Sequence, residues 1–132
     1  MTINYSSDND IIIPTQHNTT YRGLAGDDIY IITKAISDGA KINIVDTEGT
    51  NIIQLTEGLS ISSSKFASTA FQIILSNNAE ITISSSHKNL YEIGGNATTG
   101  LIVDQNSYED FISHFGINTL PSIKSIKGLT NL

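Results

Sequence analysis

Cysteine and tryptophan are absent from this chain of 132 residues, and proline occurs only twice. Without cysteine, disulfide bonds and thiolate chemistry are excluded, so bound metal ions become the natural substitute for covalent cross-links. The length predicts one domain, large enough to bury a core and small enough for a metal to matter to its stability.

Basic residues and long apolar runs are also scarce. Seven lysines and arginines stand against thirteen acids, which gives a net charge of −6 and argues against partners such as nucleic acid or anionic membranes. No segment approaches the length of a membrane-spanning helix, so membrane insertion is not expected. The first twenty residues lack a basic segment followed by an apolar run. If the protein is exported, we expect its signal elsewhere.

The most informative positive feature is the turn formed by Gly23, Gly26 and Asp28, which leads directly into the apolar segment 29–32. Glycines allow backbone conformations with positive φ, in which carbonyl oxygens can converge. An aspartate adds charge to such a group of oxygens, which suits a hard cation such as Ca²⁺. The alternative interpretation is an ordinary solvated β-turn, since Gly-Asp-Asp is a common turn sequence.

A period of nine residues surrounds this turn. If Asp28 occupies the sixth position of a nonapeptide, the sixth positions of three successive repeats hold Asp10, Thr19 and Asp28. The fourth positions then hold Asp8, His17 and Gly26, and the eighth positions hold Ile12, Tyr21 and Tyr30. In a β-roll two nonapeptides make one coil, so positions eighteen apart stack. We therefore predict that Asp10 and Asp28 face each other across one metal site. Thr19 would lie on the opposite side, where no ion is expected.

A second turn, residues 46–51, carries the pattern in weaker form. Gly49, Asn51 and Ile53 repeat the spacing of glycine, Asx and apolar residue, and Asp46 lies a further eighteen residues after Asp28. The segment between the two turns does not divide into two nonapeptides. Asp46 and Asn51 are therefore predicted to form a second, weaker metal site, with a bare β-turn as the alternative.

The rest of the chain reads as short β-strands followed by one helix. Strands are expected at 29–33, 41–45, 51–55, 59–62, 71–75, 81–84 and 90–93, with a hairpin turn at 76–79. A helix is expected at 108–115, because Ser107 can cap it and its apolar residues recur at helical spacing. Its apolar stripe is predicted to cover the open end of the β-structure.

The expected fold is mainly β: a short parallel β-roll that continues into a small β-sheet or sandwich, capped by one C-terminal amphipathic helix. Periodicity leaves open whether residues 41–93 continue the roll or form a β-sandwich, since alternation shows the faces of a strand and not its partner. Residues 1–116 form the predicted domain, and 117–132 form a tail or a linker.

In the order of its turns, at residues 21–31, 44–55, 75–81 and 94–100, the chain resembles the RTX-like, hemolysin-type calcium-binding modules. Such modules occur in large bacterial proteins exported by type I secretion, including adhesins, S-layer proteins and secreted proteases. The resemblance implies that Ca²⁺ binds after export and drives folding. It implies as metal ligands Asp8, Asp10, Gly23, Gly26, Asp28, Asp46 and Asn51. Two departures from the family pattern are Leu24 in place of its second glycine and Thr19 in place of an acid.

Two functions follow as hypotheses. The first is a non-catalytic, calcium-stabilised structural module of a bacterial protein located outside the cell or on its surface. The second is a recognition module for a cell-surface glycan, in which Tyr5, Tyr21, Tyr30 or Tyr91 would stack against sugars. Exposed tyrosines would favour the second hypothesis and buried tyrosines the first. A self-assembling surface-layer fragment is a third possibility, and other domains of a larger parent protein are expected partners. No enzyme is expected, because the three histidines are scattered and no nucleophile motif is present.

Overall fold

The computed structural model describes residues 1–56, 59–95 and 105–115. The predicted tail at 117–132 and most of the glycine-containing segment 94–100 lie outside these residues. In the described part of the chain the strands are β1 (Thr2–Asn4), β2 (Ile11–Ile12), β3 (Thr19–Arg22), β4 (Ile29–Ile32), β5 (Lys41–Val45), β6 (Ile52–Thr56), β7 (Ile61–Phe66), β8 (Ala70–Leu75), β9 (Glu80–Ser84) and β10 (Leu90–Gly95). The helices are the short 3₁₀ helix η1 (Ser86–Lys88) and α1 (Tyr108–Ser113).

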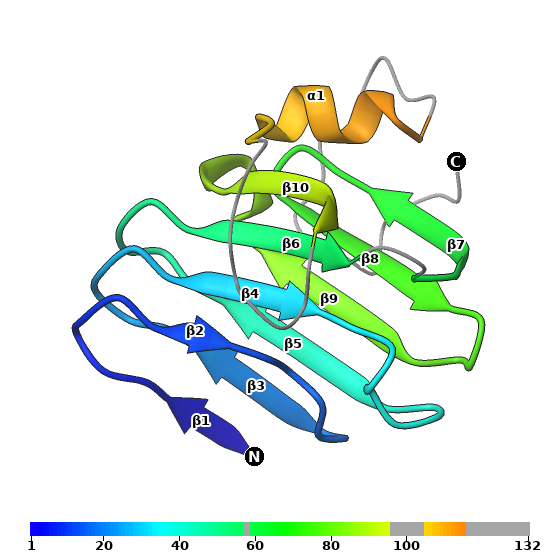
Figure 1. Ribbon diagram of the computed structural model, residues 1–132, viewed down its shortest axis with the longest axis horizontal. Coiled ribbons are helices and arrows are strands. Elements are labelled where there is room, and N and C mark those ends of the chain that lie inside the picture. Colours follow the sequence, from blue (N-terminus) through cyan, green and yellow to red (C-terminus); the bar gives the residue numbers. More distant parts are fainter. Residues whose placement is uncertain (57–58, 96–104, 116–132) are drawn as a thin grey trace.

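The described strands form two sheets, and the chain alternates between them. One sheet has the order β1-β3-β5-β9-β8-β7, and the other has the order β10-β6-β4-β2. Among the described strands, six pairs are parallel and join successive coils, whereas β8 pairs in antiparallel fashion with both β7 and β9. Figure 1 shows the coils stacked from β1 to β10, with the two sheets facing each other. The predicted parallel β-roll is therefore confirmed.

The roll extends through residues 41–93, which decides between the two expected architectures. β5 pairs with β9 and β6 pairs with β10, both in parallel, as the coils of a roll do. The antiparallel β7–β8 hairpin is an insertion within one coil. The turn predicted at 76–79 joins β8 to β9, and Asn78 adopts a positive φ of 69° there.

The core lies between the two sheets. Along each inner face, alternate residues of the strands are buried, because successive side chains of a strand point to opposite sides. The predicted apolar eighth positions Ile12, Tyr21 and Tyr30 are all buried. Their counterparts in the later coils of the second sheet, Ile53 and Tyr91, are buried as well.

Helix α1 covers the end of the roll at β10, as Figure 1 shows. Ser107 caps it as predicted, since its side chain accepts a hydrogen bond from the Asp110 N–H at 3.1 Å. The helix ends at Ser113, two residues earlier than expected. Phe111 stacks on Tyr91 with ring centroids 4.3 Å apart, so the predicted role of the helix as a lid is confirmed.

Candidate metal site

Three turns lie at the same end of the roll, immediately before β2, β4 and β6. Their last residues are Asp10, Asp28 and Asn51, and these three are stacked. The Asp10 N–H donates to Asp28 Oδ1 at 2.8 Å, and the Asp28 N–H donates to Asn51 Oδ1 at 2.9 Å. A column of Asx residues thus joins three successive coils, because the side chains of Asp28 and Asn51 each accept from the backbone N–H of the coil before.

The interval of eighteen residues from Asp28 to Asp46 does not mark a stacked pair, in keeping with the segment between them, which does not divide into two nonapeptides. Eighteen residues separate Asp10 from Asp28, but twenty-three separate Asp28 from its stacked partner Asn51. The turn at 33–40 between β4 and β5 is longer than the turn before β3, which lengthens the coil. Tyr21 of β3 pairs with Ile44 of β5. Asp46, two residues after Ile44, therefore stacks beside Gly23, two residues after Tyr21.

Glycines occupy the fourth turn position where neighbouring backbones approach closely. Gly26 has a φ of +95°, and a Cβ there would lie 2.5 Å from the Asp8 carbonyl oxygen. Gly49 has a φ of +76°, and a Cβ there would overlap with the Gly26 carbonyl oxygen. Leu24 replaces the second glycine of the family pattern, yet it keeps a positive φ of 64°. The turn geometry therefore survives this substitution.

Two buried carboxyl groups meet beside Gly23. Asp28 and Asp46 are 0% and 3% exposed. A Cβ on Gly23 would overlap with Oδ2 of both residues, so the missing side chain leaves the space into which the two oxygens point. The Tyr30 hydroxyl lies beside them; it donates to Asp46 Oδ2 at 2.7 Å and accepts from the Gly23 N–H at 2.7 Å.

The Asp28 Oδ2 oxygen has no hydrogen-bond donor in the described residues, although it is buried. Burial, together with the neighbouring Asp46 carboxyl, raises the pKa of Asp28 to about 7, although the hydrogen bond from the Asp10 N–H opposes the shift. Burial, followed by the hydrogen bond to Asp46, also raises the pKa of Tyr30. Two buried carboxylates cannot both stay ionised at low cost, so the pair must share a proton or a cation.

The structure brings the predicted site residues together in a different way from the sequence prediction. The carboxyl group beside that of Asp28 belongs to Asp46, whereas Asp10 reaches Asp28 through its backbone N–H. The Asp10 carboxylate accepts hydrogen bonds from Ser6 Oγ at 3.0 and 3.1 Å. The two sites predicted separately at Asp10/Asp28 and Asp46/Asn51 thus adjoin. Asn51 contributes its side chain to the Asx column and donates to the Glu48 carbonyl at 2.9 Å.

The described residues contain no group of three or more His, Asp or Glu side chains arranged to hold a metal ion. A cation between Asp28 and Asp46 would therefore draw its remaining ligands from backbone carbonyls or water, which Ca²⁺ accepts readily. Sequence reasoning missed the Tyr30 hydroxyl as a member of this cluster. The only sequence feature that could have indicated this role is the tyrosine at the eighth position of the nonapeptide, a position that aliphatic residues can also fill.

Comparisons with known proteins add a likeness in fold. No protein-family profile matches the chain, and no curated protein matches it. Among solved structures, the extracellular lipase LipA from Serratia marcescens is similar with a TM-score of 0.50 and 16% sequence identity. The similar region covers 69% of this chain and 14% of the lipase, so the chain spans a small part of that protein. At this identity the likeness shows the fold alone. No helix among the described residues is long and apolar enough to cross a membrane.

Proposed function

We propose that this chain is a non-catalytic, calcium-binding structural module of an exported bacterial protein, and that Ca²⁺ binding is coupled to its folding. The observation that carries this proposal is the buried pair Asp28 and Asp46, with Asp28 Oδ2 left without a donor in the described part of the chain. The likeness in fold to an extracellular lipase supports export.

The chemistry of the cluster fits a hard divalent cation. The Asp28 and Asp46 carboxylates offer oxygen ligands and negative charge, and no sulfur or histidine nitrogen lies among them. Backbone carbonyls at Gly23 and Gly26 belong to the same turn, and Asp8, Asp10 and Asn51 belong to the adjoining turns. Ca²⁺ tolerates such mixed and irregular oxygen ligands better than Mg²⁺, which requires near-octahedral geometry.

Coupling to folding follows from electrostatics. Without a cation, folding must bury two like charges or force one carboxyl to take up a proton, and either outcome opposes folding. A bound cation neutralises the pair, so the free energy of metal binding becomes free energy of folding. In the unfolded chain the two residues are solvated and separated by seventeen intervening positions, so no comparable site exists there.

The tyrosines bear on the alternative hypothesis of glycan recognition. Tyr21, Tyr30 and Tyr91 are 2%, 0% and 0% exposed, and Tyr5 packs partly buried against the core. Stacking on a sugar requires an exposed ring. Their burial therefore favours the structural module over recognition by a row of tyrosines.

Thermal unfolding tests the proposal. We expect millimolar Ca²⁺ to raise Tm relative to EDTA, with Mg²⁺ at the same concentration giving a much smaller rise. A ligand at a hundred times its Kd stabilises a fold by about 2.7 kcal/mol. Equal Tm values in EDTA and Ca²⁺ would contradict the proposal.

A pair of glycine variants tests the position of the site. Gly23→Ala places a methyl group against Asp28 Oδ2 and Asp46 Oδ2, so it should abolish most of the Ca²⁺-dependent rise in Tm. Gly39→Ala is the matched control, because its Cβ meets nothing within 4 Å and only its φ of +69° is strained. The control should lose about 1 kcal/mol of stability and keep the Ca²⁺ response. An unchanged response in Gly23→Ala would place the ion elsewhere.

A further inference from the structure

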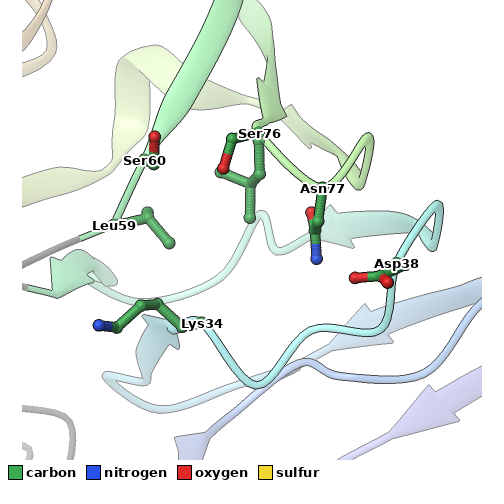
Figure 2. A pocket seen from close by; sticks show the side chains of 7 residues that line it. Lys34, Asp38, Leu59, Ser60, Ser76 and Asn77 are labelled. Carbon is green, nitrogen blue, oxygen red and sulfur yellow. The ribbon is translucent and has the colours of Figure 1, made fainter.

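A pocket of about 260 Å³ lies at the opposite end of the strands from the acidic turns. β4 begins after Asp28 at the acidic end and leads to the turn at 33–40 at the other end. The pocket lies between this turn and the neighbouring β8–β9 turn. Figure 2 shows the pocket and the side chains around it. Its lining residues are Lys34, Asp38, Leu59, Ser60, Leu75, Ser76 and Asn77.

Hydrogen bonds between its walls hold the pocket open. The Gly39 N–H donates to the Asn77 carbonyl at 3.0 Å, and Asn77 Nδ2 donates to the Ile36 carbonyl at 3.0 Å. The Ser76 N–H donates to the Ser60 carbonyl at 2.9 Å. The turn at 33–40, the start of β7 and the β8–β9 turn are thus linked, so the pocket exists before any ligand arrives.

The two charged side chains that line the pocket have no partner among the described residues. Lys34 and Asp38 form no hydrogen bond or ion pair with each other or with any other described residue, although both belong to one turn. Figure 2 shows Lys34 and Asp38 on two sides of the pocket, with Leu59 above Lys34. The hydroxyls of Ser60 and Ser76 also make no side-chain hydrogen bond in the described part of the chain. Leu59 is half-buried and Leu75 is buried, so the floor between the charges is apolar.

We propose that this pocket binds a small aliphatic zwitterion whose carboxylate and ammonium groups stand at opposite ends of a short carbon chain. Lys34 would bind the carboxylate and Asp38 the ammonium, each with help from a neighbouring serine hydroxyl. Leu59 and Leu75 would contact the methylene groups. A ligand with one charge would leave either Lys34 or Asp38 without a partner. This pattern of a few polar groups around an apolar floor is usual in small-molecule sites.

The proposal is tested by titrating the full chain, in saturating Ca²⁺, with ε-aminocaproate while the amide chemical shifts of the chain are recorded. We expect millimolar binding with shifts confined to residues 34–40, 59–60 and 75–77. Caproate and hexylamine, which each carry one of the two charges, should bind about fivefold more weakly. The expected loss is this small because one exposed ion pair adds little to the free energy of binding. Equal binding of all three compounds, or shifts spread over the surface, would overturn it.

Charge-removing variants make the assignment specific. Lys34→Met should weaken ε-aminocaproate and caproate about fivefold and leave hexylamine unchanged, whereas Asp38→Asn should weaken ε-aminocaproate and hexylamine and leave caproate unchanged. Lys88→Met, at the other end of the roll, is the control and should change none of them. If both pocket variants bind all three compounds as the parent does, the proposal fails. That outcome would leave the calcium proposal untouched, because its site lies at the far end of the strands.

Discussion

At the scale of the residue, identical side chains in this protein behave differently because their surroundings differ. Asp10 and Asp28 occupy the same position in successive coils, yet Asp10 is partly exposed and bound by Ser6, whereas Asp28 is fully buried. Burial beside Asp46 raises the pKa of Asp28 to about 7 from an ordinary value of 3.8. The chemistry of the site thus rests on the pair, and neither aspartate alone would supply it.

This pKa predicts how the metal-free protein responds to pH. A carboxyl group whose pKa is raised by folding stabilises the fold fully below its unfolded pKa, and this contribution disappears as the pH rises through its folded pKa. We therefore expect the Tm in EDTA to fall as the pH rises from about 4 to beyond about 7. Ca²⁺ should oppose this fall, because the cation replaces the proton between the two carboxylates.

Asp28→Asn should remove most of this fall, since an amide does not titrate. Above about pH 7 the metal-free variant should be more stable than the parent, and its Ca²⁺ response should be smaller. Thermal melts in EDTA across the pH range would measure both effects. Asp38→Asn, at an exposed position, is the matched control and should melt as the parent does. A parent-like fall in the Asp28 variant would show that Asp28 does not govern it.

At the scale of the element, helix α1 stabilises the roll through one aromatic cluster. Phe111 contacts Tyr91 and Phe71, and Tyr108 donates to the Ala67 carbonyl at 2.7 Å. Asn106 also pairs with Tyr91 along the outer edge of β10. The helix segment therefore covers both the apolar end of the core and part of a strand edge that would otherwise stay unpaired.

Phe111→Ala tests this role. Removing a fully buried phenylalanine should cost about 3–5 kcal/mol, because the cavity adds to the lost transfer free energy. Urea unfolding in saturating Ca²⁺ would measure the loss. Glu109→Ala, on the exposed side of the same helix, should change stability by under about 0.5 kcal/mol. A loss for Phe111→Ala as small as that of the control would show that the helix is not part of the cooperative fold.

At the scale of the whole molecule, the two ends of the strands carry different groups of turns. One end gathers the acidic turns before β2, β4 and β6, and the other gathers the longer turns around the pocket. The helix closes the roll at β10, whereas β1 and β2 each pair with one neighbour in the described part of the chain. The calcium proposal therefore predicts that removing the metal loosens one region more than another.

Hydrogen exchange measures this difference. Without Ca²⁺ we expect amides of the Asx column, those of Asp10 and Asp28, to lose protection by at least tenfold. The amides of Leu75 and Tyr91, which donate to Ala79 and Asn106, should lose much less. Equal losses at all four amides would indicate global unfolding without local coupling to the acidic turns.

Much of this architecture could be predicted from local patterns. Lys41–Val45 alternates between polar and apolar residues, and it forms β5 with the expected bounds. The spacing of nine placed Ile12, Tyr21 and Tyr30 in the core correctly, because a repeated coil imposes a repeated side-chain direction. The capping serine and the apolar stripe located α1 to within two residues at its end.

The sequence by itself determined the short strands and the turns of the first coils, because strand alternation and turn glycines act over a few residues. The tertiary structure decided that the roll continues through residues 41–93, because that depends on which strands pair. The tertiary structure alone decided which acids meet. The coil joining Asp28 to Asn51 has five more residues than the coil before it, so counting by eighteen misaligned Asp46. Asp46 reaches Asp28 because the absent side chain of Gly23 leaves room between them. The distance between the two carboxyl groups depends on how separate coils stack, so no local sequence pattern predicts it.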